Sequence, residues 1–100
     1  MIQHVVAFRL SAEDAEGKHQ QSTLAQAELW KLDSGKIPGL LALQVRPDLG
    51  KDSTHWDLVL VSHHESESAL ADYMAHPLHI AVAKEVATHV AEKAIIDSAL

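Results

Sequence analysis

The hydrophobic positions of this chain follow two spacings, which predict strands and helices in alternation. Residues 2–10 are rich in β-branched and aromatic side chains and predict a strand. The same signal predicts two more strands at 40–45 and 56–64, and the closing segment 93–100 predicts a fourth. Four short strands separated by helical patterns indicate a mixed α and β domain.

The first helical pattern lies between the first two predicted strands. Ser11 offers an N-cap, and the acidic residues within 13–16 suit a helix start, but Gly17 weakens the first turns. The helix is therefore predicted with most support over 22–32. Its apolar stripe is made of Leu24, Ala25, Leu29 and Leu32.

The second helical pattern lies between the third and fourth predicted strands. It begins near Ser66, breaks before Pro77 because proline does not fit a helix interior, and continues from there to about Ala91. The resulting order, β-α-β-β-α-β, is typical of the α+β ferredoxin-like fold, a four-stranded antiparallel sheet with helices on one face. We expect one domain over 1–100 with strand order 4-1-3-2.

The predicted sheet has two unlike faces. The bulkier set of the first strand is expected to face the helices: Ile2, His4, Val6, Phe8 and Leu10. The opposite face is expected to carry Val5, Ala7, Val59 and Val61, joined by Leu41, Leu43 and Val45. Because no further segment is left to cover this apolar face, the sequence predicts a homodimer packed sheet against sheet, an α+β barrel. The alternative is a sheet face that is only less polar than usual, since strand propensity alone enriches valine.

A simple register between the first and third strands adds two expected pairs. It places His4 opposite Ser62 and Arg9 opposite Asp57. The second pair would neutralise two charges on the face assigned to the dimer.

Composition narrows the classes of function. The chain has 100 residues and no cysteine, so disulfides, thiol catalysis and thiolate metal sites are excluded. The formal net charge of −6 argues against nucleic acid and anionic membranes as partners. No apolar run approaches the roughly 20 residues of a membrane span, and the N-terminus lacks a signal-peptide pattern, so we expect a cytoplasmic protein.

Histidine is the unusual residue type, with eight copies in the chain. In a helix from Pro77, His79 shares a side with Val82 and Val86, so burial is expected to lower the pKa of its imidazole. A neutral imidazole is a suitable general base. His4 on the first strand and Tyr73 on the preceding helix are expected to line the same space between helices and sheet.

Several motifs together resemble one family. They are HVVAFRL at the start, IPGL in the first turn, DYMAHPLH at 72–79 and the closing IIDSAL. This set resembles the stress-responsive A/B barrel (Dabb) family, and the resemblance implies a dimeric α+β barrel. The family holds members without an assigned reaction and a polyketide cyclase, olivetolic acid cyclase. By that resemblance His79 would be the base, Tyr73 a hydrogen-bond donor to a substrate carbonyl, and His4 an assisting group.

One departure from that cyclase concerns its further pocket tyrosine on the first helix. Tyr73 is the only tyrosine in this chain, so the resemblance implies a different substrate. We therefore expect a small dimeric barrel that binds an apolar small molecule. The alternative is a polyketide cyclase- or isomerase-like enzyme that uses His79 and Tyr73 on a carbonyl compound.

Two other roles compete for the histidines. One is packing, in which each buried imidazole is satisfied by a backbone carbonyl or water. The other is a metal site built from His76, His79 and His4. Pro77 separates the first two, and no carboxylate stands at a matching spacing, so the sequence predicts neither a metal nor a cofactor.

Overall fold

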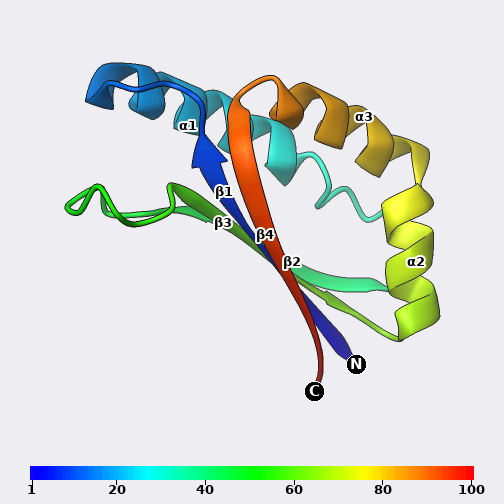
Figure 1. Cartoon of the computed structure of the whole chain (residues 1–100). Coiled ribbons are helices and arrows are strands. Elements are labelled where there is room, and N and C mark those ends of the chain that lie inside the picture. Colours follow the sequence, from blue (N-terminus) through cyan, green and yellow to red (C-terminus); the bar gives the residue numbers. More distant parts are fainter.

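A four-stranded antiparallel sheet, covered on one side by helices, forms the fold (Figure 1). The computed structural model describes residues 1–100. The elements are β1 (Ile2–Leu10), α1 (Ala15–Trp30), β2 (Leu40–Pro47), β3 (Leu58–His64), α2 (Glu67–Ala75), α3 (Pro77–Ala87) and β4 (Val90–Ala99). The strands are arranged β2-β3-β1-β4, which confirms the predicted order. None of the helices combines the length and apolar character that a membrane crossing requires.

The inner face of the sheet is the face covered by the helices, and it carries the core. Burial alternates strictly along β1, where every even-numbered residue from His4 to Leu10 is buried. The expected pairing of His4 with Ser62 is present. The inner face packs against the apolar sides of α1 and α3, which contribute Ala25, Leu29, Val82 and Val86.

The start of α1 differs from the prediction. The helix begins at Ala15, and the N-cap is Asp14, whose carboxylate accepts a hydrogen bond from the Gly17 amide at 2.6 Å. A side chain at position 17 would lie 2.8 Å from that carboxylate, so glycine permits the cap instead of weakening the turn. Ser11 does not cap the helix, and Leu24 is exposed because it lies off the buried side of α1.

The expectation that Leu43 and Val45 join the uncovered face is wrong. Both side chains are buried in the core, opposite Ser62 and Leu60. The register shifts between Leu40 and Ala42, so one extra residue in β2 exchanges the faces of the residues that follow.

The apolar part of the outer face therefore comes from the other three strands, because β2 contributes Gln44 and Arg46 opposite Val61 and Val59. Val5 lies between Val61 and Ile96, and Ala7 lies between Val59 and Ala94. We call Val5, Ala7, Val59, Val61, Ala94 and Ile96 the outer patch. It remains an apolar surface that no segment of this chain covers.

The expected ion pair between Arg9 and Asp57 does not form. The Arg9 guanidinium lies 3.7 Å from the Glu92 carboxylate, and the Asp57 carboxylate binds the Lys18 ammonium at 2.9 Å. Asp57 also accepts a hydrogen bond from the Leu10 amide, which turns its side chain toward α1.

The last two elements also differ from the prediction. The helix α3 ends at Ala87 instead of near Ala91, and β4 starts at Val90 instead of at residue 93.

Candidate functional site

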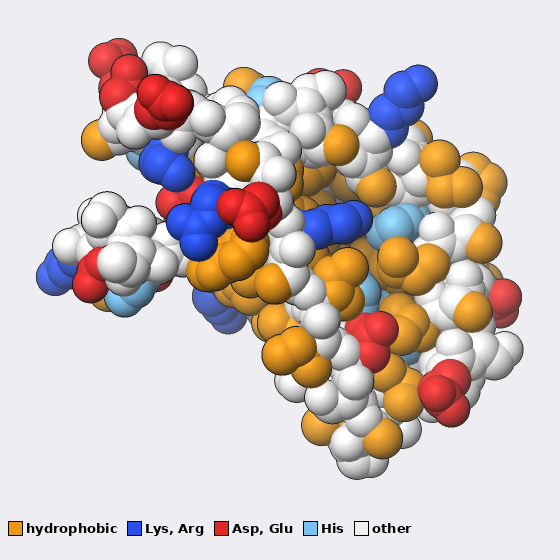
Figure 2. Space-filling model, in the orientation of Figure 1, with side chains coloured by type: hydrophobic (Ala, Val, Ile, Leu, Met, Phe, Trp, Pro, Cys, Tyr) orange, Lys and Arg blue, Asp and Glu red, His pale blue; other side chains and the backbone are white.

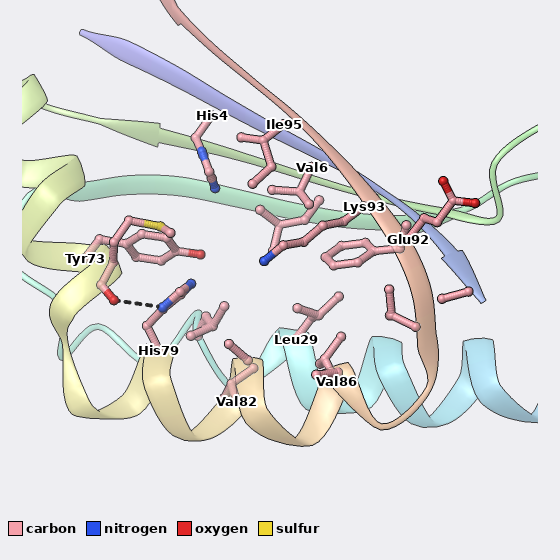
Figure 3. A pocket seen from close by; sticks show the side chains of 18 residues that line it. His4, Val6, Leu29, Tyr73, His79, Val82, Val86, Glu92, Lys93 and Ile95 are labelled. Carbon is pink, nitrogen blue, oxygen red and sulfur yellow. Dashed lines mark hydrogen bonds between the residues drawn. The ribbon is translucent and has the colours of Figure 1, made fainter. Parts of the chain in front are cut away.

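An apolar cavity lies between the inner face of the sheet and α3. Its volume is about 260 Å³, and 14 of its 18 lining residues are hydrophobic. Figure 2 shows this side of the molecule hollowed between β4 and the helices, with hydrophobic side chains and histidine in the hollow. His4, Tyr73 and His79 meet at one end, whereas Glu92, which also lines the cavity, lies toward the other end (Figure 3). The structure thus brings the three predicted site residues into one cavity.

His79 stands on the first turn of α3 and is half-buried. Its Nδ1 lies 3.1 Å from the Met74 carbonyl oxygen. Because a carbonyl only accepts, Nδ1 carries the proton, and the Nε2 lone pair of the neutral ring is directed into the cavity (Figure 3). Burial holds the pKa of His79 below its ordinary value, although the bond to Met74 acts in the opposite direction. The ring is therefore neutral near neutral pH.

Tyr73 lies on α2 and is almost fully buried. The centre of its ring is 4.6 Å from the His79 ring centre. Burial raises the pKa of Tyr73 to about 12, and a hydrogen bond with Ser62 only partly opposes that rise. The phenol therefore keeps its proton at neutral pH and is a hydrogen-bond donor, with its oxygen directed toward the cavity (Figure 3).

His4 projects from β1 into the same end of the cavity and is 3% exposed. Its Nδ1 donates to the carboxylate of Asp97, the residue opposite it on β4. That bond fixes the orientation of the ring. The ring centres of His4 and Tyr73 are 6.0 Å apart. The rings of His4 and His79 therefore both lie next to the same phenol.

A third imidazole, not singled out in the sequence, completes the buried cluster. His64 is fully buried beside Tyr73, with ring centres 4.6 Å apart. Its Nε2 lies 2.8 Å from the Ser62 hydroxyl, and its Nδ1 has no hydrogen-bond partner. Burial, aided by the neighbouring His4, lowers the pKa of His64 to about 4. The alternation of side chains along the strand could have identified His64 from the sequence, because it places His64 on the same face as Ser62.

Sequence reasoning also missed two residues of β4. Asp97 and Lys93 both lie on the inner face, opposite His4 and Phe8. Lys93 lines the cavity, whereas Asp97 reaches it only through His4. Alternation puts both residues on the same face of the strand as Ile95, but only the pairing with β1 shows which face that is.

Two further histidines, His76 and His63, do not join the site. His76 is the N-cap of α3, and its Nδ1 accepts a hydrogen bond from the Leu78 amide at 3.1 Å. His63 lies on the outer face, within 3.2 Å of the Gln3 side-chain amide. No group of three or more histidine or acidic side chains is arranged to hold a metal ion.

The fold and the sequence both have known counterparts. A dimeric protein of unknown function with a ferredoxin-like fold from Bacteroides fragilis is 22% identical, with a TM-score of 0.84 over 99% of this chain and 95% of that one. A dimeric ferredoxin-like protein of unknown function from Thermobifida fusca is 26% identical, with a TM-score of 0.78 over 99% of this chain and 90% of that one.

A hydroxynitrile lyase from Passiflora edulis is 14% identical, with a TM-score of 0.71 over 99% of this chain and 92% of that one. No curated protein sequence matches this chain. The model of a domain family, the stress responsive A/B barrel domain, matches residues 2–100. These matches confirm the ferredoxin-like fold and the family resemblance drawn from the motifs.

Proposed function

This chain belongs to the stress-responsive A/B barrel (Dabb) domain family, and on that premise we propose that it is a homodimer that binds a small, mainly apolar molecule in the cavity between sheet and helices. One observation carries the proposal: a mainly apolar cavity with three polar side chains, those of His4, Tyr73 and His79, together at one end. Ligand sites in proteins are typically mostly apolar, with a small number of polar groups that fix the orientation of the ligand.

The size of the cavity limits the ligand. A volume of about 260 Å³ lies just below the range of roughly 300–1,000 Å³ that drug-sized ligands occupy. Burial of apolar surface contributes roughly 25 cal/mol per Å², so a short alkyl chain or a single ring supplies most of the affinity. Tyr73 and the histidines then select for an oxygen-bearing group at one end of the ligand.

Binding of octanol tests this proposal without knowledge of the natural ligand. We expect isothermal titration calorimetry to detect octanol binding to the wild-type protein. Val82→Phe is expected to abolish that binding, because Val82 lines the cavity and the larger side chain fills it. Ala83→Leu fills the same cavity from the next residue and replaces Val82→Phe if that variant folds poorly. The matched control is Ile80→Phe, since Ile80 lies on the same helix but is exposed.

Two results would contradict the proposal. One is the absence of any octanol binding to the folded wild-type protein. The other is equal binding by the wild type and by folded variants with a filled cavity, which would place the ligand elsewhere on the molecule.

The dimer part of the proposal is supported by the outer patch and by the relatives. The solved structures from Bacteroides fragilis and Thermobifida fusca are both described as dimeric. In this chain, Val5, Val59 and Val61 are only partly buried, and they lie side by side on the uncovered side of the sheet. A second copy packed on this surface removes it from water.

A second candidate function is proton transfer at a carbonyl compound, and the His79 tautomer favours it. With Nδ1 held by the Met74 carbonyl, Nε2 is free to take a proton from the carbon next to a bound carbonyl. The Tyr73 phenol donates a hydrogen bond to the enolate oxygen that results. The proton returns from His79 to carbon, so no other reactant is needed. The hydroxynitrile lyase with this fold is an enzyme, which supports a search for catalytic activity in the cavity of this protein.

Hydrogen–deuterium exchange of 2-octanone in D₂O tests that chemistry. We expect the wild-type protein to accelerate exchange at the carbons beside the carbonyl, measured by proton NMR. His79→Asn removes the base and is expected to lower the rate by about 10²-fold or more. Tyr73→Phe is expected to lower it less, and His89→Asn is the control. Exchange no faster than in buffer, or an undiminished rate in His79→Asn, would exclude this second function for simple ketones.

A further inference from the structure

Lys93 places a positive charge in the lining of a mainly apolar cavity. It lies on β4 opposite Phe8, so its side chain extends from the inner face of the sheet. Figure 3 shows its amine directed into the cavity, on the side where Tyr73 and His79 present their polar atoms. The sheet residues around it in the cavity lining are mainly apolar, among them Val6, Phe8 and Ile95, and Glu92 is its neighbour along β4.

No group of the chain neutralises this ammonium. The salt bridges and side-chain hydrogen bonds of the structure do not include Lys93. The nearest acids on β4 pair with other groups. Glu92 also lines the cavity, but its carboxylate lies 3.7 Å from the Arg9 guanidinium, and Asp97 pairs with His4. A chain with a net charge of −6 thus presents an unpaired cation at the opening of its apolar cavity.

We propose that the ligand is an amphipathic carboxylate, with its apolar part against Val6, Val82 and Val86 and its carboxylate on the Lys93 ammonium. This inference rests on the proposed ligand-binding function and names its ligand class. Solvent screens an ion pair next to apolar walls less than one in open solvent. The negative charge of the ligand therefore strengthens binding next to Lys93.

The polar groups of the cavity suit a carboxylate better than a phosphate. Lys93 supplies one positive charge, and the Tyr73 hydroxyl supplies one further donor within the same cavity. The cavity contains neither an arginine nor a second lysine, so the charge of a dianion would be only half neutralised. The imidazole of His79 is neutral and offers a lone pair, which does not attract an anion.

Calorimetry with three probes of equal chain length tests the ligand class: octanoate, octanol and octylamine, at neutral pH. We expect octanoate to bind about tenfold more tightly than octanol, and octylamine to bind most weakly. Lys93→Met keeps the apolar stem of the side chain and removes its charge. It is expected to weaken octanoate binding about tenfold, which corresponds to roughly 1.4 kcal/mol, and to leave octanol binding unchanged.

Two more variants complete the design. Lys84→Met removes an exposed lysine from the last turn of α3, outside the cavity, and is expected to leave all three affinities unchanged. Lys93→Glu reverses the charge and is expected to reverse the preference, so that octylamine binds more tightly than octanoate.

The outcomes separate this inference from the proposal on which it rests. If octanol binds and octanoate binds no more tightly, or if Lys93→Met weakens both probes equally, the carboxylate assignment is overturned while the apolar site stands. If none of the three probes binds to the folded protein, the proposed function itself is overturned.

Discussion

The two faces of this sheet are built from the same strands but meet different surroundings. On the inner face the helices of the same chain cover β1 and β3, although β4 stays largely exposed, and polar side chains such as Ser62 and His64 are fully buried. On the outer face the residues that alternate with them, Val61 and His63, are only partly buried. Polar groups are therefore enclosed on one face, whereas an apolar surface is left open on the other.

This contrast separates two tasks of the molecule. A buried polar side chain that lacks a full set of hydrogen bonds lowers the free energy of unfolding. The polar cluster on the inner face therefore needs strong apolar packing around it to offset that loss. The leucine and valine core next to the cluster supplies that packing. The outer face has no such cluster, and its apolar side chains suit contact with a second copy. We therefore propose that the covered face binds the ligand and that the uncovered face forms the dimer contact.

The largest effect is expected from a charge placed in the outer patch. Val61→Glu puts a carboxylate among apolar side chains, and an unpaired charge buried in a dimer contact costs about 3–5 kcal/mol. We expect analytical ultracentrifugation to show a dimer for the wild type and a folded monomer for the variant. Leu24→Glu, at an exposed site on α1, is the control and should remain dimeric. A Val61→Glu protein that is still dimeric would remove the outer patch as the interface.

Acidification is expected to weaken the inner face next. The folded-state pKa of His64 is about 4, below the value of roughly 6.5 that an unfolded chain has. As the pH falls from 6.5 toward 4, the unfolded state gains a proton on this residue that the folded state does not. The free energy of unfolding therefore decreases in that range, by up to about 3 kcal/mol.

His64→Leu isolates this contribution, because leucine does not titrate. Urea unfolding measured at several pH values should show a smaller loss of stability for the variant than for the wild type. Identical pH dependence of the two proteins would mean that His64 does not resist protonation in the folded state.

A smaller effect is expected where the two ends of the chain meet on the inner face. Asp97→Ala removes the only hydrogen-bond partner found for the buried His4 ring, and it is expected to lower the free energy of unfolding by about 1–2 kcal/mol. Asp72→Ala, at an exposed position of α2, is the control. Equal urea midpoints for the two variants would show that the contact of Asp97 with His4 contributes nothing to stability.

The smallest effect is expected from the ion pair at the edge of the outer face. Arg9 and Glu92 are separated by 3.7 Å, and the Glu92 side chain is 65% exposed. Exposed pairs of this kind contribute roughly 0–1 kcal/mol, so Glu92→Gln should change the free energy of unfolding by less than about 0.5 kcal/mol. A loss above 1 kcal/mol would indicate that the pair is enclosed in the dimer.

The sequence predicted the fold well because its signals are local and repeated. Alternation in β1 and β3, the proline at the start of α3 and the order of elements together specify the sheet. The face of β2 was missed because the extra residue near Leu41 leaves no mark in the hydrophobic pattern. The start of α1 was missed because Gly17 was judged by helix propensity alone, whereas its lack of a side chain makes room for the Asp14 cap.

The candidate site was predicted in part. Helical spacing and strand alternation placed His79, Tyr73 and His4 around one space, and the structure brings them together. Lys93 and Asp97 required the face of the closing strand, which depends on its pairing with β1 across almost the whole chain. Long-range register of that kind is not contained in a local pattern.

The most direct test of the account uses the valine methyl groups, which report on both faces. Octanol is titrated into methyl-labelled protein, and the NMR shifts of Val82 and Val86 in the cavity are compared with those of Val59 and Val61 on the outer face. We expect saturable shifts for the cavity pair and little change for the outer pair. Shifts confined to Val59 and Val61, or no shifts at all, would contradict the claim that the covered face holds the ligand site.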